Sequence, residues 1–246
     1  MFLIVFILAA PSHAQIPPMT ETESQDFITE TSQLYTQLEY PVLVHYANIR
    51  YVKFENSMGD EEYNPVLSDY PGATLATGLS KMDLFMESEP NESCHIIFVN
   101  QNYDQLKTRM ITPLMNTVLT EKILFKMHLI HELGHCIDYQ NMQKLMSTGW
   151  NKNPNVHALL NKHNTKEVKI WSESFADSFA SLWMIKSGYR EALEKMIYLR
   201  ESRKEKDPSH YTADALRKIN FDKSDNICYI AHEARGGEKI LWPVCK

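Results

Sequence analysis

The spacing of apolar side chains divides the chain into a mixed first half and a mainly helical second half. Residues 120–143 contain no proline and a single glycine, and their apolar positions recur every three or four residues, as on a helix buried along most of its surface. Residues 171–187 carry an aromatic side chain at every fourth position from Trp171 to Trp183. We therefore predict two long helices, each with an apolar face that packs in the core.

Shorter strand-like and helical segments elsewhere in the chain indicate an α+β fold. The runs 42–54 and 94–100 are strand-like, and a glycine-containing segment at 72–79 lies between them. Helical spacing is found again in three shorter segments, at 24–39, 190–204 and 212–219. We expect a small mixed sheet with helices in the first part of the chain and mainly helices in the second part.

Length and charge narrow the class of protein. A chain of 246 residues can form one hydrophobic core or two lobes around a cleft, so we assign 15–246 to one domain, divisible into lobes 15–119 and 120–246. The 25 basic and 31 acidic residues give a net charge of −6 without any basic stripe, which argues against a nucleic-acid partner. The mixed run 200–207 predicts a solvated helix end.

The first long helix contains the sequence His131-Glu132-Leu133-Gly134-His135. Histidines four positions apart project from one face of a helix, so both imidazoles can bind one zinc ion. Glu132 lies about 100° round the helix from His131, where its carboxylate can reach a metal-bound water instead of the metal. The pattern predicts one catalytic Zn²⁺ ion, with His131 and His135 as ligands and Glu132 as general base.

Two further positions on this helix carry specific expectations. A glycine in a helix interior costs about 1 kcal/mol relative to alanine, so Gly134 predicts that a neighbouring element approaches closely. His128 lies on the same edge as the ligand pair, one turn earlier. We interpret His128 as a solvated or hydrogen-bonded histidine and not as a ligand.

A catalytic zinc needs a third protein ligand and an open fourth position. Glu173 on the second long helix is the best candidate, since it shares with Asp177 the side opposite the aromatic face. Asp177, one turn further, is expected to accept the free ring N–H of a ligating histidine and so fix the orientation of that ring. His157 or His163, within the polar segment 147–168, could replace Glu173 as the third ligand.

The sequences H-E-L-G-H and E-S-F-A-D together resemble the gluzincin branch of the zinc metallopeptidases, the thermolysin-like clan. The A-D ending and the later sequence Asp207-Pro208-Ser209-His210-Tyr211 also show a faint similarity to the CAAX prenyl endopeptidase family and its periplasmic relatives. The whole resemblance covers residues 120–215. The resemblance implies a zincin-like fold, in which the active-site cleft separates a sheet-bearing N-terminal part from a helical C-terminal part. It also implies that a sheet edge, at 70–79 or 94–100, pairs with the backbone of a peptide or protein substrate.

In the CAAX family a histidine that follows the glutamate-bearing helix assists catalysis, and His210 is the matching residue here. We expect His210 or Tyr211 to donate a hydrogen bond to the oxyanion of a tetrahedral intermediate. His232 is a further alternative for that role.

The N-terminus predicts export. Residues 2–10 form an apolar run, Pro11 interrupts it, and Ser12-His13-Ala14 has the small-x-small form of a cleavage site, so we interpret 1–14 as a signal peptide. The mature protein would then be periplasmic or extracellular, without stable membrane insertion.

The four cysteines fit an oxidising compartment. We favour the pairs Cys94–Cys136 and Cys228–Cys245 among the three possible connectivities. Cys136 follows His135 directly and is turned about 100° away from it, so we do not expect Cys136 to bind zinc.

These features leave three functions to consider. The first is a secreted zinc endopeptidase in which Glu132 takes a proton from the attacking water and passes it to the leaving amine. The second is a catalytically inactive, zinc-stabilised binding protein. The third is a zinc amidase that acts on cell-wall peptides. Glu132 favours an enzyme, because hydrolysis requires a general base and zinc binding does not.

Overall fold

A computed structural model of the chain describes residues 16–47, 49–55, 61–67, 70–74, 93–99, 103–147, 165–221, 226–236 and 244–245. The proposed signal peptide at 1–14 and the alternative ligands His157 and His163 lie outside the described residues. The first part of the chain contains α1 (Glu21–Tyr35), β1 (Val42–Ala47), β2 (Ile49–Glu55), β3 (Glu61–Leu67), β4 (Tyr70–Thr74) and β5 (Cys94–Val99). The second part contains α2 (Tyr103–Leu106), the π-helical turn η2 (Lys107–Ile111), α3 (Thr112–Leu114), α4 (Glu121–Ser147), α6 (Thr165–Lys186), α7 (Glu191–Ser202), the 3₁₀ turn η4 (Pro208–His210), α8 (Ala213–Leu216) and α9 (Ile227–Ala234).

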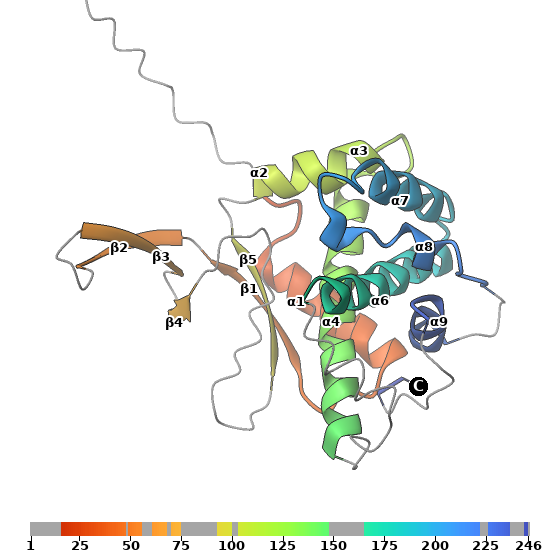
Figure 1. Cartoon of the computed structure of the whole chain (residues 1–246), viewed down its shortest axis with the longest axis horizontal. Helices are drawn as coiled ribbons and strands as arrows, with labels where there is room; N and C mark the ends of the chain where they lie inside the picture. The colour runs from red at the N-terminus through yellow and green to blue at the C-terminus, as the bar shows by residue number, and fades with distance from the viewer. Residues whose placement is uncertain are drawn as a thin grey trace, which may run out of the picture.

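The two long helices form the centre of the molecule, and α6 lies across α4 in Figure 1. Their crossing is close at Gly134, where a Cβ atom would lie 2.9 Å from the Cα of Ala176. The predicted close approach to Gly134 is therefore confirmed, and the neighbouring element is α6. Both helices are longer than predicted, since α4 continues to Ser147 and α6 begins at Thr165.

The predicted α+β class is confirmed, but the described strands do not form a single mixed sheet, because the segment 42–54 is divided between two sheets. β1 pairs in parallel with β5, whereas β2, β3 and β4 form a separate antiparallel sheet that extends away from the helices in Figure 1. Helix α1 closes the outer edge of β1. The Gln25 amide accepts from the Val44 N–H at 2.7 Å and donates to the Val42 carbonyl at 3.0 Å. Because this edge is occupied by side chains, a third strand cannot pair there.

The boundaries of the shorter helices also differ from prediction. α1 begins at Glu21 instead of 24, because Thr20 and Glu23 form a capping box at its start. It ends at Tyr35 instead of 39, because Thr36 is in an extended conformation. α7 and α8 are shorter than the predicted helices 190–204 and 212–219.

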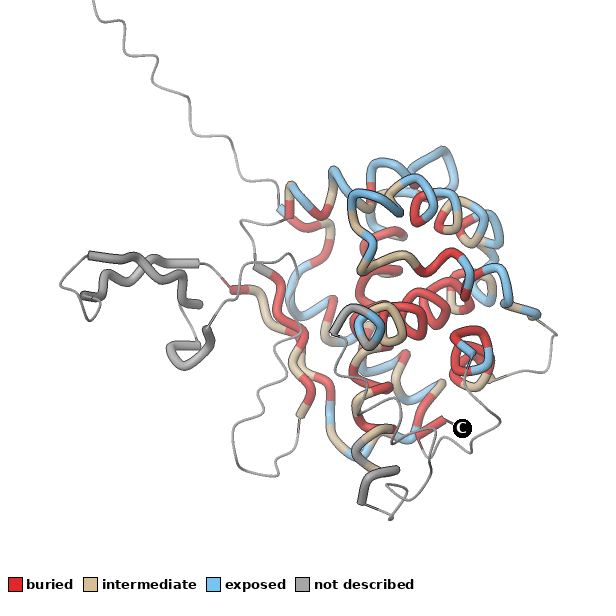
Figure 2. Tube along the Cα trace, in the orientation of Figure 1, coloured by how far each residue is buried: buried red, intermediate tan, exposed pale blue. Residues whose placement is uncertain are grey.

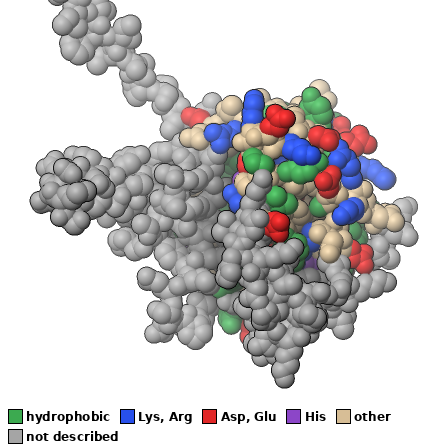
Figure 3. Space-filling view, viewed as in Figure 1, with side chains coloured by type: hydrophobic (Ala, Val, Ile, Leu, Met, Phe, Trp, Pro, Cys, Tyr) green, Lys and Arg blue, Asp and Glu red, His purple; other side chains and the backbone are tan. Residues whose placement is uncertain are grey.

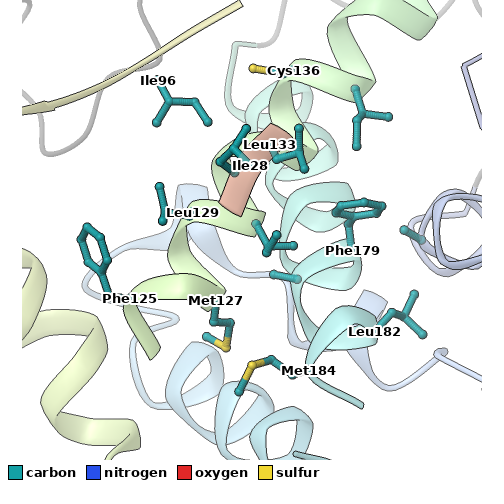
Figure 4. Packing of buried hydrophobic residues seen from close by; sticks show 14 of the residues in the cluster. Ile28, Ile96, Phe125, Met127, Leu129, Leu133, Cys136, Phe179, Leu182 and Met184 are labelled. Atoms are coloured by element: carbon teal, nitrogen blue, oxygen red, sulfur yellow. The ribbon is translucent and has the colours of Figure 1, made fainter. Parts of the chain in front are cut away.

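The hydrophobic core lies between the β1–β5 sheet and the helices, and Figure 2 shows buried positions along α4 and α6. Figure 4 shows Leu129, Leu133 and Phe179 pointing into this core. Phe98 of β5 packs against Phe125 of α4, with ring centroids 5.2 Å apart. The core therefore joins the sheet to the helix that carries the H-E-x-x-H sequence.

Both predicted disulfides are confirmed. Cys94–Cys136 joins β5 to α4, and Cys228–Cys245 joins α9 to the C-terminal tail. Cys136 is thus bonded to sulfur and is unavailable as a metal ligand.

The described surface agrees with the mixed charge of the sequence. Lys and Arg side chains alternate with Asp and Glu over the helical face drawn in Figure 3. Within the described ranges, the helices are too short or too polar to cross a membrane.

Candidate metal centre

Three predicted ligands come together at the crossing of α4 and α6. His131 and His135 lie one turn apart on α4, and their Nε2 atoms are 3.2 Å from each other. Oε2 of Glu173 on α6 is 3.4 Å from the His131 Nε2 and 3.7 Å from the His135 Nε2. These three atoms form a group that could hold a metal ion.

Burying the Glu173 carboxylate in this arrangement costs free energy unless a cation is bound. Glu173 is 7 % exposed, and its Oε2 atom is buried without a hydrogen bond of acceptable geometry. A buried carboxylate oxygen in that situation loses the hydration of its charge and gains no donor. A metal ion between the three atoms would satisfy it.

The other ring nitrogen of His131 faces a carboxylate. Nδ1 lies 2.9 Å from Oδ1 of Asp177, which is fully buried. An ionised carboxylate can only accept, so Nδ1 carries a proton, and Nε2 would present its lone pair to a metal ion that displaces the second ring proton. Asp177 thus stands where it can fix the tautomer and orientation of the His131 ring.

Asp177 is itself held by buried partners. Arg200 of α7 donates to both of its oxygens, at 2.7 and 2.8 Å, and the Thr212 hydroxyl donates to Oδ2 at 2.5 Å. Although burial raises the pKa of Asp177, the charge of Arg200 and the hydrogen bond with His131 lower it strongly overall. The carboxylate is therefore ionised across the physiological range. The predicted solvated helix end is wrong at Arg200, which is 5 % exposed.

The ring of His135 is held from α6. Its Nδ1 lies 3.0 Å from the Ser172 hydroxyl, one residue before Glu173. When Nδ1–H donates to this oxygen, Nε2 of His135 is left with a lone pair that faces Glu173. Each histidine is thus oriented by a side chain of the helix that supplies the third ligand.

The electrostatics of the group favour added positive charge. Burial lowers the pKa of His131, but Asp177 and Glu173 raise it to about 10, with a further contribution from Glu132. These three buried carboxylates stand beside one buried guanidinium of the described chain, that of Arg200, since the buried Arg235 pairs with Asp138. A divalent cation would compensate this excess of negative charge.

Glu132 and His128 lie next to each other on the side of α4 that borders the ligands. Glu132 is 4 % exposed, and its Oε1 is 3.4 Å from the Nε2 of His128. Burial and the charges of His131 and Arg200 lower the pKa of His128 to about 3, so its ring is neutral at physiological pH. His128 is not among the three residues of the ligand group, and because it is buried the solvated interpretation is wrong.

His210 contacts the ligand group from η4. Its Nε2 lies 3.2 Å from Oε1 of Glu173, and its Nδ1 lies 2.7 Å from Oδ1 of Asp207. Burial lowers the pKa of His210, but Glu173 and Asp207 raise it overall. His210 thus contacts the Glu173 oxygen that is not directed at the two histidines. Tyr211 is directed elsewhere, since its hydroxyl donates to Asp214 at 3.2 Å.

An apolar pocket opens beside the ligand group. His128 and His131 form part of its wall, and the methionines Met110, Met127 and Met196 contribute from η2, α4 and α7. The pocket is therefore bounded by helices of the second part of the chain. Its cavity volume of about 10 Å³ has room for about one water molecule.

His232 lies outside this centre. Its Nδ1 accepts from Arg235 at 2.5 Å, and Phe175 packs on its ring at a centroid separation of 4.2 Å. It also approaches the sulfur atoms of Cys228 and Cys245, but these form a disulfide and are not thiolate ligands.

Sequence reasoning missed four residues that support the centre: Ser172, Arg200, Asp207 and Thr212. Ser172 could have been found, because it adjoins Glu173 on a predicted helix. Arg200 and Thr212 carry no local signal, since each reaches Asp177 only through the packing of separate elements.

Comparisons with known proteins found no matching family model, curated protein or solved structure.

Proposed function

We propose that this protein is a zinc-dependent endopeptidase, with His131, His135 and Glu173 as zinc ligands. The convergence of two Nε2 atoms and one buried carboxylate oxygen carries the proposal. Tetrahedral ligands at the usual zinc distances of about 2.0–2.1 Å lie about 3.3 Å apart. The observed separations of 3.2, 3.4 and 3.7 Å are close to this value. The nitrogen-rich donor set also suits zinc better than magnesium or calcium, which prefer oxygen ligands.

A bound zinc ion would supply Lewis acidity, which lowers the pKa of water and polarises a carbonyl group. Glu132 supplies the proton transfer. Its carboxylate, which borders the ligands, takes the proton of the attacking water and delivers it to the departing amide nitrogen. The Oε1 atom of Glu132 lies 3.4 Å from the Nε2 atom of His128, whose ring is neutral at physiological pH.

His210 supplies the donor for the developing oxyanion. Asp207 holds its Nδ1, so that Nε2–H is directed towards the centre, where it contacts Glu173. In the peptidase reaction, this N–H turns from Glu173 to the oxygen of the carbonyl under attack. Tyr211, whose hydroxyl is engaged by Asp214, is the weaker candidate for this role.

The surroundings suit an extended peptide. α1 occupies the outer edge of β1, and among the described strands β5 pairs only with β1, so the other edge of β5 is our candidate for pairing with substrate backbone. Two disulfides support an exported protein that acts in an oxidising compartment.

The deciding experiment compares wild type with Glu132→Gln on denatured protein substrates and on cell-wall peptides. Glu205→Gln, a change at an exposed glutamate of the loop after α7, is the matched control. We expect Glu132→Gln to keep one zinc per chain and to lose at least about 10²-fold in activity, because only the base is removed. Chelation should abolish wild-type activity, and zinc should restore it.

Metal analysis separates the two parts of the proposal. Glu173→Ala should lose zinc, whereas Glu132→Gln should retain it. Full zinc content in Glu173→Ala would remove Glu173 from the ligand set and direct attention to His157 or His163. Equal activity of wild type and Glu132→Gln would favour the non-catalytic binding protein, and cleavage of cell-wall peptides alone would identify the amidase.

A further inference from the structure

A second group of side chains whose chemistry could support catalysis lies on the β1–β5 sheet, away from the metal centre. Side chains alternate between the two faces of a strand. Val44 of β1 and Ile96 of β5 point into the core, and so does Cys94, which bonds to α4. His45 and His95 are therefore on the opposite face of the sheet, where both are partly exposed.

Ser93, His95 and His45 form a continuous chain of contacts on this face. The Ser93 hydroxyl is 2.7 Å from the Nε2 of His95, and the Nδ1 of His95 is 3.0 Å from the Nε2 of His45. The two ring centroids are 5.1 Å apart and the ring planes differ by 18°.

These values define how the rings meet. An imidazole nitrogen lies about 1.1 Å from the centre of its ring, so an in-line N–H···N contact of 3.0 Å accounts for nearly all of the 5.1 Å. The rings of His45 and His95 are thus nearly coplanar and meet edge to edge. A metal bound by both nitrogens would require the rings to meet at an angle, so the geometry favours a shared proton.

Proton placement follows from the donor inventory. If the Ser93 hydroxyl donates to Nε2 of His95, then Nδ1 of His95 carries the ring proton and donates it to His45. Burial and the nearby His45 ring lower the pKa of His95, so the ring of His95 is neutral and able to accept a proton at pH 7. This order of contacts is that of a nucleophile, a general base and a group that orients the base.

We propose that Ser93, His95 and His45 form a second, metal-independent site in which Ser93 accepts an acyl group from small carboxylic esters. Ser93 Oγ bonds to the ester carbonyl carbon while its proton passes to Nε2 of His95. The bond to the leaving alcohol then breaks, and His95 gives the proton to that alcohol. Water repeats the sequence, which releases the carboxylic acid and restores the Ser93 hydroxyl.

The identity of His45, the third residue of the group, restricts which esters can be hydrolysed. A neutral imidazole stabilises a protonated His95 less than a carboxylate would, so His95 is a weaker acid–base catalyst here. Esters with acidic leaving groups, such as phenols, need the least assistance with departure. Aryl esters are therefore the expected substrate class.

A fluorophosphonate probe tests the site, because it phosphonylates nucleophilic serines with loss of fluoride. The reaction is run on the whole protein in the presence of a chelator, and labelled positions are mapped by mass spectrometry. Ser202, which is exposed and donates to the Leu199 carbonyl, is the reference serine within the same chain. We expect Ser93 to be labelled at least about 10²-fold faster than Ser202.

Variants assign the other two roles. His95→Gln should slow labelling of Ser93 by at least about 10²-fold. His45→Phe removes the acceptor and should slow it about 10-fold, whereas His45→Gln keeps an acceptor and should restore most of the rate. Hydrolysis of 4-nitrophenyl acetate should fall in Ser93→Ala to the background of the denatured chain. Melting temperatures near that of wild type establish that each variant is folded.

Labelling of Ser93 no faster than that of Ser202 would overturn the proposal, and so would equal labelling of wild type and His95→Gln. Equal rates in wild type and His45→Phe would also contradict it, because the three-residue arrangement would then be without effect. The chelator removes any zinc-dependent hydrolysis, so the outcome is independent of the proposed endopeptidase activity.

Discussion

Gly134 of α4 and Ala176 of α6 lie so close that a Cβ atom on the glycine would be 2.9 Å from the alanine Cα. Gly134 stands between Glu132 and His135, and Ala176 stands between Glu173 and Asp177. This close approach of the two helices thus lies at the candidate metal centre. The short separation allows a glutamate side chain of one helix to reach the histidines of the other.

Gly134→Ala is expected to weaken metal binding. Alanine is about 1 kcal/mol better than glycine in a helix, but the added carbon would meet backbone and force the helices apart, at a cost of about 1–3 kcal/mol. We expect a net loss of stability in urea unfolding and about a tenfold loss of zinc affinity in competition with a chelating dye. Unchanged affinity would show that the crossing distance does not control the site.

Asp177→Asn should lower zinc affinity by about 10- to 100-fold. A neutral amide oxygen is a weaker acceptor for the Nδ1–H of His131 than an ionised carboxylate, so the ring would be held less firmly in the orientation that binds the metal. Asp138→Asn is a matched control, since Asp138 also forms a buried two-point pair with an arginine, Arg235. Both changes should reduce stability by leaving a buried guanidinium without its counter-charge. Affinity should fall only in Asp177→Asn, and an equal fall in both variants would indicate a general loss of structure.

The two disulfides are expected to differ in their effect on the centre. Replacing Cys228 and Cys245 with alanine opens a loop of 17 residues and should cost about 3 kcal/mol in unfolding free energy. The Cys94–Cys136 bond closes 42 residues and should contribute about 4 kcal/mol. Because Cys136 adjoins His135, loss of the second bond should also lower zinc affinity, which titration of the two double-alanine variants would reveal.

His232 should make the protein less stable in mild acid. Burial and the charge of Arg235 hold the pKa of His232 well below its ordinary value, and its other ring nitrogen, Nε2, lies 3.2 Å from the side-chain amide nitrogen of Asn141. The unfolded chain takes up a proton below about pH 6.5, whereas the folded protein does not. The stability from this residue is therefore complete above about pH 6.5 and is lost as the pH falls, by up to about 1.4 kcal/mol per pH unit.

Urea unfolding at pH 8.0, 6.5 and 5.0 measures this dependence. His232→Leu removes the titrating ring. Below pH 6.5 the number of protons taken up on unfolding should therefore decrease by about one, and the slope of unfolding free energy against pH should become correspondingly smaller. Parallel curves for the two proteins would contradict the assignment.

Sequence alone determined the parts of this protein that depend on contacts within a single helix. His131 and His135 share a face because a helix repeats every 3.6 residues, whatever packs around it. The same period placed Glu173 and Asp177 on one side of the second helix. The glycine at 134 indicated a close neighbour without indicating which one.

Tertiary structure decided every relation between elements. That α6 is the neighbour of Gly134, that Arg200 is buried against Asp177 and that His210 contacts Glu173 all depend on how separate helices and loops pack. The division of 42–54 into two strands of different sheets depends on α1, whose Gln25 occupies the edge of β1. Local periodicity is set by backbone geometry over a few residues, whereas these contacts join residues that are distant along the chain, so only the folded arrangement specifies them.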